Sequence, residues 1–356
     1  MIACTAKNDR AGLLFDELRN MRPDIVDLGS IRSSRAVRLF GAISSISFKT
    51  SNLRHDFQFS PMVARDLERT SVRRLKSAPG VRHILQWGAT SFPQPPTQTA
   101  CGYSLVTDGP YDPEDASYPS EWIPGRWKTE FFSRQRKIYT KARFVFALSE
   151  WGRQKLIKVH GLDPGKVIRI GWGPMFYAKR KAEIGRNESQ FASIGNGWQR
   201  KGMDVVADAA RLLHRRCPDS SVVIAGKPFG MEVETGNGVV SIPRGLSRTE
   251  VMELIENSRA IIVASRFDPS PHIILEALQL GTPIVATNLC GMPEVVRPPA
   301  GGRVVQPDDP EALASALEEV LAGDEREQRC LAQEEYCDLG GWRRAAEIIS
   351  SALDTL

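Results

Sequence analysis

Two carboxylates, Asp268 and Glu276, stand eight residues apart directly after the apolar run AIIVAS (260–265). The run predicts a buried strand, so we expect Asp268 on the loop that leaves the strand and Glu276 about one turn into the next helix. Ligands of an open parallel sheet bind just outside the carboxyl ends of its strands. A helix that begins near His272 also directs amide N–H groups and the positive end of its dipole toward a phosphate. The spacing therefore predicts a site for a phosphorylated ligand.

The neighbours of Glu276 argue against an ordinary solvated helix residue. They are the apolar residues Ile273, Ile274, Leu275, Ala277 and Leu278. A carboxylate in such surroundings needs a polar partner, and its two acceptor oxygens suit the diol of a ribose. We therefore expect Glu276 to bind a nucleotide ribose, against the alternative of a solvated surface glutamate.

Short apolar runs alternate with longer amphipathic segments along the whole chain, which predicts an α/β fold with parallel sheets. At 356 residues the chain is long enough for two such domains. Strands are expected in the first half at IACT, 25–30, 81–88, 103–109 and 143–149, and in the second half at 191–195, 221–226, 260–265, 282–287 and within GGRVVQP. A helix is expected over PEALASALEEVLAG, with Pro310 near its start and Gly323 near its end.

Two segments lack apolar periodicity. Residues 171–190 mix Gly, Pro and charge, as expected of a linker between domains. The stretch from Ser91 to Pro124 is rich in proline and is expected to form a long functional loop.

The composition narrows the classes of site. Six scattered cysteines without a C-x-x-C pair predict neither a disulfide framework nor a zinc site, and the five histidines lack metal-ligand spacing, so no metal site is expected. The sequence shows no leader peptide and no apolar stretch of membrane-spanning length, which predicts a cytoplasmic protein.

The pattern of an acidic residue, seven others and a Glu, followed by ALQLGTPIVAT and CGMPEVV, resembles the signature of retaining glycosyltransferase family four. The resemblance extends through SIGNGWQRKGMDVVADAARLL, SSVVIAG and IPRGLSRTEVMELIENSRAIIVAS, and covers roughly residues 130–350. It implies a GT-B fold, in which two doubly wound Rossmann-like domains flank a cleft and a C-terminal helix crosses back. The implied boundaries are 1–172 for an acceptor-side domain, 173–189 for a linker, 190–338 for a donor-binding domain and 339–356 for the crossover helix.

The same resemblance implies a function. The chain would be a hexosyltransferase that moves a sugar from a nucleotide-diphosphate sugar to a glycan, a lipid-linked glycan or another acceptor. Transfer would retain the anomeric configuration and need neither a metal nor a cofactor besides the donor, and the setting would be cell-envelope or exopolysaccharide synthesis.

Roles within the donor site follow from the resemblance position by position. Glu276 would bind the donor ribose, Asp268 the hydroxyls of the donor sugar, and Lys201 the diphosphate. The amides of His272, Ile273 and Ile274 would share the charge of the diphosphate, which is electrostatic catalysis by fixed positive groups.

Three positions depart from the family pattern. Asp268 replaces the usual Glu and is one methylene shorter. Asn196 stands where the family has an arginine, so a cationic fork is missing there. Arg200 is either its replacement or an ordinary surface charge. Asp108 stands where the family has a histidine, and either orients sugar hydroxyls or is a turn residue.

Further positions of the implied site are weaker matches. The family's N-terminal glycine-rich loop is reduced to Gly12. Gly245 and Leu246, with Arg244 and Trp198, fall where the nucleotide base and nearby phosphates lie, although Trp198 equally suits a packing role. Gly291 and Glu294 follow TPIVAT, and Gly291 is expected there for its backbone geometry.

Other classes of protein remain as alternatives. A nicotinamide dehydrogenase is disfavoured because the third glycine of G-x-G-x-x-G, after the GNG at 195–197, would fall at Arg200. A sugar-nucleotide epimerase of GT-B fold and a nucleotide-sugar or polyanion-binding protein without turnover stay open, because a fold does not fix chemistry.

Charge differs sharply between the two halves. Residues 1–187 hold 31 basic and 17 acidic side chains, a net charge of +14. The remaining residues have a net charge of −9, which gives the total of +5. The basic residues concentrate at 69–77 and 133–143, where Arg73, Arg74 and Lys76, and Arg134, Arg136 and Lys137, are the clearest clusters. Solvated helix faces are one explanation. We expect instead an anionic acceptor or peripheral contact with an anionic membrane, and no nucleic-acid partner.

Overall fold

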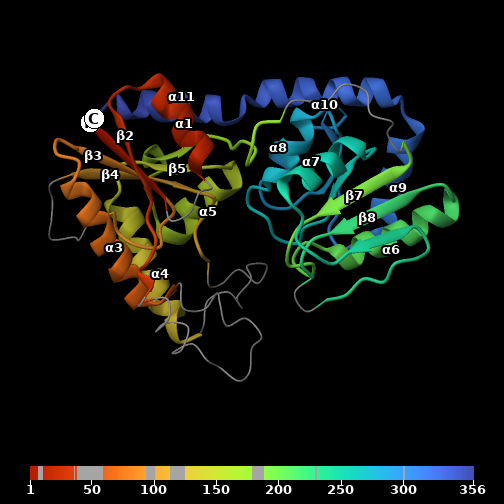
Figure 1. The fold of residues 1–356 in the computed structure, drawn as a ribbon, viewed down its shortest axis with the longest axis horizontal. Coiled ribbons are helices and arrows are strands. Elements are labelled where there is room, and N and C mark those ends of the chain that lie inside the picture. Colours follow the sequence, from red (N-terminus) through yellow and green to blue (C-terminus); the bar gives the residue numbers. More distant parts are fainter. Residues whose placement is uncertain are drawn as a thin grey trace. The chain divides into compact units, whose positions relative to one another are not determined.

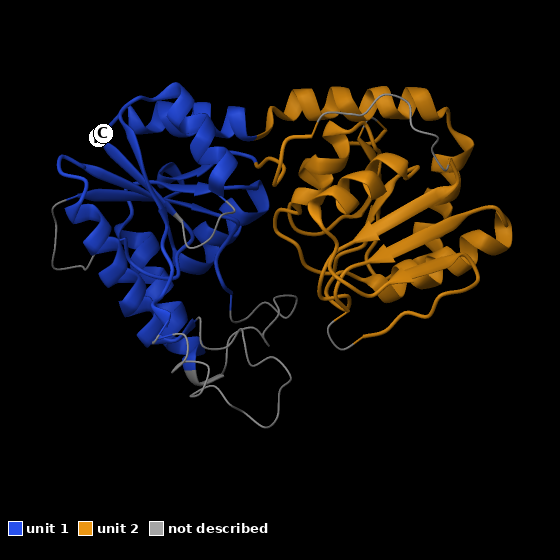
Figure 2. Ribbon diagram, in the orientation of Figure 1, with its two compact units in different colours: residues 1–171, 342–356 blue, residues 172–341 orange. Residues whose placement is uncertain are grey.

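A computed structural model describes residues 1–6, 11–35, 37, 59–93, 101–112, 125–178, 188–228, 231–299 and 301–356. The chain divides into two compact units, of which the first comprises residues 1–171 and 342–356 and the second residues 172–341 (Figure 2). The long loop expected between Ser91 and Pro124 and the linker expected at 173–189 lie partly outside the described residues.

The first unit is a doubly wound α/β unit (Figure 1). Its sheet has the order β2-β1-β3-β4-β5-β6, and each pair of neighbouring strands is parallel. The strands are β1 (Ile2–Ala6), β2 (Ile25–Ser30), β3 (His83–Trp87), β4 (Gly102–Thr107), β5 (Val145–Ala147) and β6 (Val167–Arg169). The helices are α1 (Gly12–Met21), α3 (Pro61–Lys76), α4 (Gly125–Lys141), α5 (Glu150–His160), the 3-10 helix η4 (Pro164–Lys166) and α11 (Gly341–Leu353).

The second unit repeats this architecture with the order β12-β11-β10-β7-β8-β9, again parallel throughout. Its strands are β7 (Gln190–Ile194), β8 (Ser221–Ala225), β9 (Val239–Ile242), β10 (Ile261–Val263), β11 (Ile284–Thr287) and β12 (Gly302–Val305). Its helices are α6 (Met203–Arg216), α7 (Arg248–Asn257), α8 (His272–Gln279), the 3-10 helix η5 (Met292–Glu294), α9 (Pro310–Ala322) and α10 (Glu325–Leu339). The prediction of two doubly wound parallel sheets is confirmed.

Apolar strands between two helical layers explain why both sheets are buried. In the second unit α6 and α9 pack on one face of the sheet, and α7, α8 and α10 cover the other (Figure 1). The largest buried side chains of its core include Phe191 at the start of β7 and Trp198 in the loop that follows the strand. Because both faces are covered, only the strand ends and their loops are left to carry function.

The terminal helix α11 belongs to the first unit. Trp342 is buried there and meets the ring of Trp87 edge-on, with 5.8 Å between ring centroids. Arg22, just after α1, donates from Nη1 to the carbonyl of Ser350 at 3.0 Å and to Asp354 at 2.5 Å. The last helix of the chain is thus fixed to residues near its beginning.

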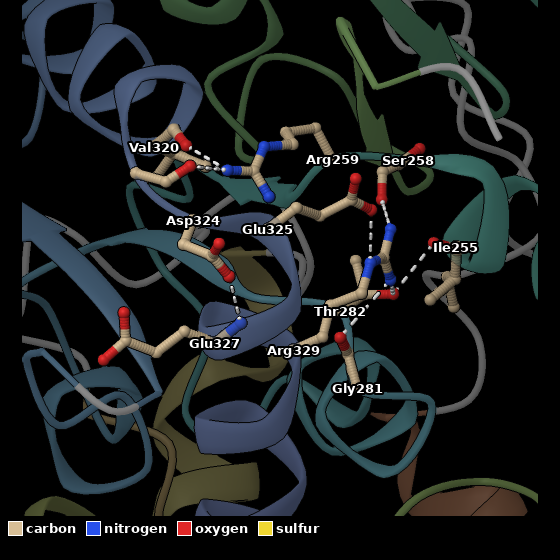
Figure 3. A network of polar contacts seen from close by, with 11 residues as sticks. Ile255, Ser258, Arg259, Gly281, Thr282, Val320, Asp324, Glu325, Glu327 and Arg329 are labelled. Carbon is tan, nitrogen blue, oxygen red and sulfur yellow. Dashed lines mark hydrogen bonds and ion pairs between the residues drawn. The ribbon is translucent and has the colours of Figure 1, made fainter.

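Two buried arginines attach helices to the amino-terminal edge of the second sheet (Figure 3). Arg259, just before β10, donates to the carbonyl of Val320 at 2.6 Å, at the end of α9 where helical carbonyls lack partners. Arg329 on α10 donates to the carbonyl of Ser258 at 2.9 Å and to the hydroxyl of Thr282 at 3.2 Å. This edge therefore carries hydrogen bonds that hold helices to the sheet, while the opposite edge carries the predicted site.

Candidate active site

The predicted donor-site residues gather where the strand order of the second sheet reverses. From β7 the chain continues outward through β8 and β9, whereas β10 lies on the other side of β7 and leads to β11 and β12. The loops after β7 and β10 therefore diverge at neighbouring strand ends, which is where open α/β sheets bind ligands. Lys201 follows β7, and Asp268 follows β10.

Lys201 and Asp268 form a direct ion pair across this point. The Lys201 ammonium donates to Oδ2 of Asp268, and Nη1 of Arg200 lies 3.9 Å from the same oxygen. Arg200 also donates to the carbonyl of Phe267 at 2.6 Å, and its side chain is only 24% exposed, so it is directed at the Asp268 loop rather than at solvent. Burial acts to raise the pKa of the Asp268 carboxyl, but the charges of Lys201 and Arg200 outweigh it and hold that pKa below its ordinary value.

Two glycines give the lysine its place. A Cβ on Gly195, at the end of β7, would lie 3.2 Å from Cε of Lys201, so the bare glycine lets the lysine side chain lie across it. Gly202 begins α6 at a φ of +65°, and a Cβ there would lie 2.1 Å from the carbonyl oxygen of Ala264. Only glycine permits this approach, which brings the β7 and β10 loops together.

Arg266, which the sequence analysis did not single out, holds the same two loops. It makes a bidentate pair with Asp204 at 2.9 and 2.7 Å, donates to the carbonyl of Gln199 at 2.6 Å, and pairs with Asp308 at 2.7 Å. Paired guanidinium and carboxylate forks fix geometry as well as charge. The signal available in the sequence was an arginine two residues before Asp268, which alone does not distinguish it from a surface charge.

Glu276 is 5% exposed, and its Oε1 accepts a hydrogen bond from the amide of Met175 at 3.2 Å. The partner expected from its apolar neighbours is therefore a backbone amide. Burial raises the pKa of Glu276 to about 7, against the opposing effects of the Met175 amide and the charges of Arg248 and Lys201. At neutral pH this carboxyl lies near the midpoint of its titration.

Residues on both sides of Met175, the partner of Glu276, are hydrogen-bonded to α8. Trp172 donates to the carbonyl of Pro271 at 3.5 Å, and Nδ1 of His272 lies 2.7 Å from the carbonyl of Gly173, to which the ring N–H donates. Gln279 donates to the carbonyl of Phe176 at 3.1 Å. These bonds keep Met175 over Glu276.

The start of α8 uses one of its amides locally. The amide of Ile274 donates to the carbonyl of Pro271 at 3.2 Å. The anion-binding roles of the amides of His272, Ile273 and Ile274 stay predictions.

Asn196 has a role in the fold that an arginine would not fill. Its Oδ1 accepts a hydrogen bond from the amide of Lys227 at 2.8 Å, which ties the loop after β7 to the loop after β8. Gly245 and Leu246 lie on the loop after β9, and a Cβ on Gly245 would lie 3.4 Å from Cε of Lys227. These residues thus line the carboxyl edge on the β8–β9 side of the sheet.

Two glycine and tryptophan expectations are settled by local geometry. Trp198 is wholly buried in the core, so the packing alternative is the right one. Gly291 has a φ of −82°, which any residue adopts, so its φ does not require a glycine. The positive φ of this loop, +52°, belongs to the preceding Cys290.

Asp108 and Gly12 lie in the first unit. Asp108 is exposed at the carboxyl end of β4, beside the turn in which Thr107 Oγ1 accepts from the amide of Gly109 at 3.3 Å. Gly12 is the first residue of α1. The roles of Asp108 and Gly12 in the site stay predictions.

The raised pKa of Glu276 predicts a pH-dependent stability. Between the ordinary pKa of 4.5 and about 7, the folded protein binds more protons at this group than the unfolded chain does, so its contribution to the free energy of unfolding falls as the pH rises. Glu276→Gln cannot ionise, and should exceed the wild type in unfolding free energy by up to about 3 kcal/mol at about pH 8 while matching it at about pH 4.5. Urea unfolding of both proteins across this range measures the difference.

The exposed Glu319, which pairs with Arg303 at 3.0 Å, supplies the matched control Glu319→Gln. An equal gain in that variant, or a Glu276→Gln gain that is the same at both pH values, would contradict the assignment of a buried, proton-binding carboxyl.

Comparisons with known proteins show what the chain is similar to. Residues 177–335 match the family described as glycosyl transferases group 1. The D-inositol 3-phosphate glycosyltransferase of Mycolicibacterium gilvum is 28% identical over 211 residues, covering 53% of this chain and 47% of that protein. The chain thus matches about half the length of that curated relative.

Solved structures extend the likeness to the whole fold. The sucrose-phosphate synthase of Thermosynechococcus elongatus superposes with a TM-score of 0.72 at 15% identity, covering 99% of this chain and 98% of that one. The UDP-forming α,α-trehalose-phosphate synthase of Burkholderia vietnamiensis gives 0.70 at 12% identity and full coverage of both. The chain therefore has the GT-B fold, and its residues 177–335 are similar to the family described as glycosyl transferases group 1.

Proposed function

We propose that the protein transfers a sugar from a nucleotide-diphosphate sugar to an acceptor hydroxyl, with retention of configuration and without a metal. The observation that carries this proposal is the group at the switch point, where Lys201 and Arg200 meet the Asp268 carboxylate while Glu276 lies on the adjoining helix. Two cations suit a diphosphate, and two differently placed carboxylates suit a ribose and a sugar.

Each group has one task in the proposed reaction. The diphosphate lies against Lys201 and Arg200, the ribose diol donates to Glu276, and the sugar hydroxyls donate to Asp268. The bond between the anomeric carbon and the phosphate oxygen breaks, and its electron pair stays on the phosphate. The acceptor oxygen bonds to the same face of that carbon, and its proton passes to the leaving phosphate, so no dedicated protein base is needed. Lys201 stabilises the charge that grows on the leaving group.

The relatives support this donor and acceptor chemistry. The Burkholderia enzyme is named for releasing UDP, and the Mycolicibacterium relative for glycosylating D-inositol 3-phosphate. Both names, together with that of sucrose-phosphate synthase, point to hydroxyl acceptors or products that carry phosphate. The basic first half of this chain is suited to such an anionic acceptor, whether a soluble sugar phosphate or a lipid-linked glycan.

Removing Glu276 should abolish donor binding. Glu276→Ala takes away the ribose acceptor, so we expect loss of nucleotide-sugar binding by calorimetry while the protein stays folded.

Lys201→Ala should reduce kcat more than donor affinity, because the ammonium acts on charge that develops in the transition state. A thermal-shift screen of UDP-, GDP- and ADP-sugars identifies the donor beforehand, since specific binding raises stability.

Glu319→Ala, an exposed change in the same unit, is the control and should bind like the wild type. Full donor affinity in Glu276→Ala would sink the assignment of the ribose site.

Two measurements test the proposed stereochemistry and the proposed independence from metal. We expect the anomeric proton of the product to show by NMR the same configuration as the donor, and turnover to be unchanged by EDTA. Donor labelled in the sugar separates the alternatives, because an epimerase would invert a ring carbon without transfer and a binding protein would leave the donor intact. Inversion at the anomeric carbon, or loss of activity with EDTA, would contradict the proposal.

The basic residues of the first unit divide into structural and exposed ones. Arg74 donates to the carbonyl of Leu28, and Arg134 donates to the carbonyl of Phe59 at 2.8 Å with its guanidinium over the ring of Phe131. These two therefore hold the fold, which corrects their place in the predicted clusters. Exposed basic residues of the two helices include Arg69, Arg73 and Lys76 on α3 and Arg136, Lys137 and Lys141 on α4.

No helix among the described ranges is long and apolar enough to cross a bilayer. We propose a peripheral contact at the cytoplasmic face of a membrane, within envelope or exopolysaccharide synthesis. Clustered Lys and Arg gain roughly 1 kcal/mol each near an anionic surface. Changing Arg69, Arg73 and Lys76 together to Glu should therefore weaken co-sedimentation with anionic liposomes at least tenfold at low salt.

The same reversal at Arg211, Arg215 and Arg216 on α6 changes the net charge equally in the other unit and should have little effect. Equally poor sedimentation of the wild type with anionic and zwitterionic liposomes would instead favour a soluble acceptor.

A further inference from the structure

The Lys201–Asp268 pair is shielded from water. The Lys201 side chain is 13% exposed and that of Asp268 is 15% exposed. The pair is reinforced by Arg200, whose Nη1 lies 3.9 Å from the same carboxylate oxygen. Ion pairs that are this poorly hydrated cost more to break than exposed ones, because either partner is then left without water or counter-charge.

The groups assigned to the diphosphate and to the sugar are therefore bonded to each other. Under the proposed function, a diphosphate that approaches Lys201 competes with the Asp268 carboxylate for one ammonium. The carboxylate is then adjacent to a second anion and has lost its hydrogen bond. A sugar attached to the diphosphate compensates for this, because its hydroxyls donate to the carboxylate oxygens. A nucleoside diphosphate alone brings no such donors.

We propose that Asp268 makes the site discriminate between the intact nucleotide-sugar and the nucleoside diphosphate product. The inference rests on the proposed function and adds a specificity role to the residue. After transfer, the sugar hydroxyls leave with the acceptor, and Asp268 returns to Lys201 and displaces the product. The charge of Asp268, and not only its shape, is what produces this effect.

The test compares the wild type with Asp268→Asn, which keeps the size of the side chain and removes its charge. Calorimetry measures the Kd of each protein for inorganic pyrophosphate, for UDP, GDP and ADP, and for the matching nucleotide-sugars. We expect the variant to bind pyrophosphate and the preferred nucleoside diphosphate at least tenfold more tightly. The affinity for the nucleotide-sugar should rise less or fall, so the preference for the intact donor narrows.

Two further variants isolate the cause. Asp208→Asn removes the same charge from the same unit, where Asp208 pairs with Arg211 at 3.0 Å on the exposed face of α6, and should leave all affinities unchanged. Asp268→Glu keeps the charge, and should bind the diphosphates within about threefold of the wild type. This second change at the same position also covers the case in which Asp268→Asn does not fold, because a tightening in Asp268→Glu would by itself overturn the role of the charge.

The outcomes separate the two levels of the proposal. If the wild type binds a nucleotide-sugar, but Asp268→Asn binds diphosphates no more tightly than the wild type, the discrimination by Asp268 is overturned and the donor site stands. If no nucleotide or nucleotide-sugar binds the wild type, the proposed function and this inference both fail.

Discussion

The close approach of Gly202 to the carbonyl of Ala264 is the constraint on which the second unit's site depends. A Cβ at this position would overlap that oxygen, so the loop after β7 reaches the end of β10 only because residue 202 is glycine. The approach starts α6 beside the strand and carries the preceding Lys201 to Asp268. Arg266 then fixes the same two loops by binding Asp204 on α6. The position of Lys201 beside Asp268 thus depends on this backbone contact.

Buried charged side chains have different numbers of polar partners at the two edges of the second sheet. At the amino-terminal edge, Arg329 is 3% exposed and donates to the carbonyls of Gly281 and Ser258, to the hydroxyl of Thr282 and to the carboxylate of Glu325. At the carboxyl edge, Glu276 has one backbone amide as partner and a strongly raised pKa. Burying a carboxyl with so few polar partners lowers the free energy of unfolding. Residues that reduce the stability of a protein in this way are typical of functional sites.

Much of this arrangement could be predicted from the sequence, because apolar runs between polar segments specify buried parallel strands. The strands β1–β5, β7, β8 and β10–β12 were predicted in this way, and the spacing of Asp268 and Glu276 placed both beyond a strand end. Strands β6 and β9 were not predicted, because both are edge strands with one buried residue each and lack the longer apolar runs that indicated the other strands. Helix α10 was also missed, because its sequence EREQRCLAQEEYCDL is largely polar. The hydrogen bond from the amide of Met175 to Glu276 joins residues far apart in the sequence, so the sequence alone does not predict it.

The position where the family pattern has an arginine is Asn196 in this chain, and Arg200 stands four residues later. Oδ1 of Asn196 accepts the hydrogen bond that joins the loops after β7 and β8, and an arginine at this position could not accept it. Arg200 is anchored on the carbonyl of Phe267, next to Asp268, and so lies on the β10 side of the switch point together with Lys201. Both charges then act on the shorter carboxylate of Asp268, which needs this convergence to stay ionised while buried. The two departures from the family pattern within this unit, Asn196 and Asp268, therefore lie in one local arrangement: the Asn196 amide joins two loops, and the adjacent cations Arg200 and Lys201 meet Asp268.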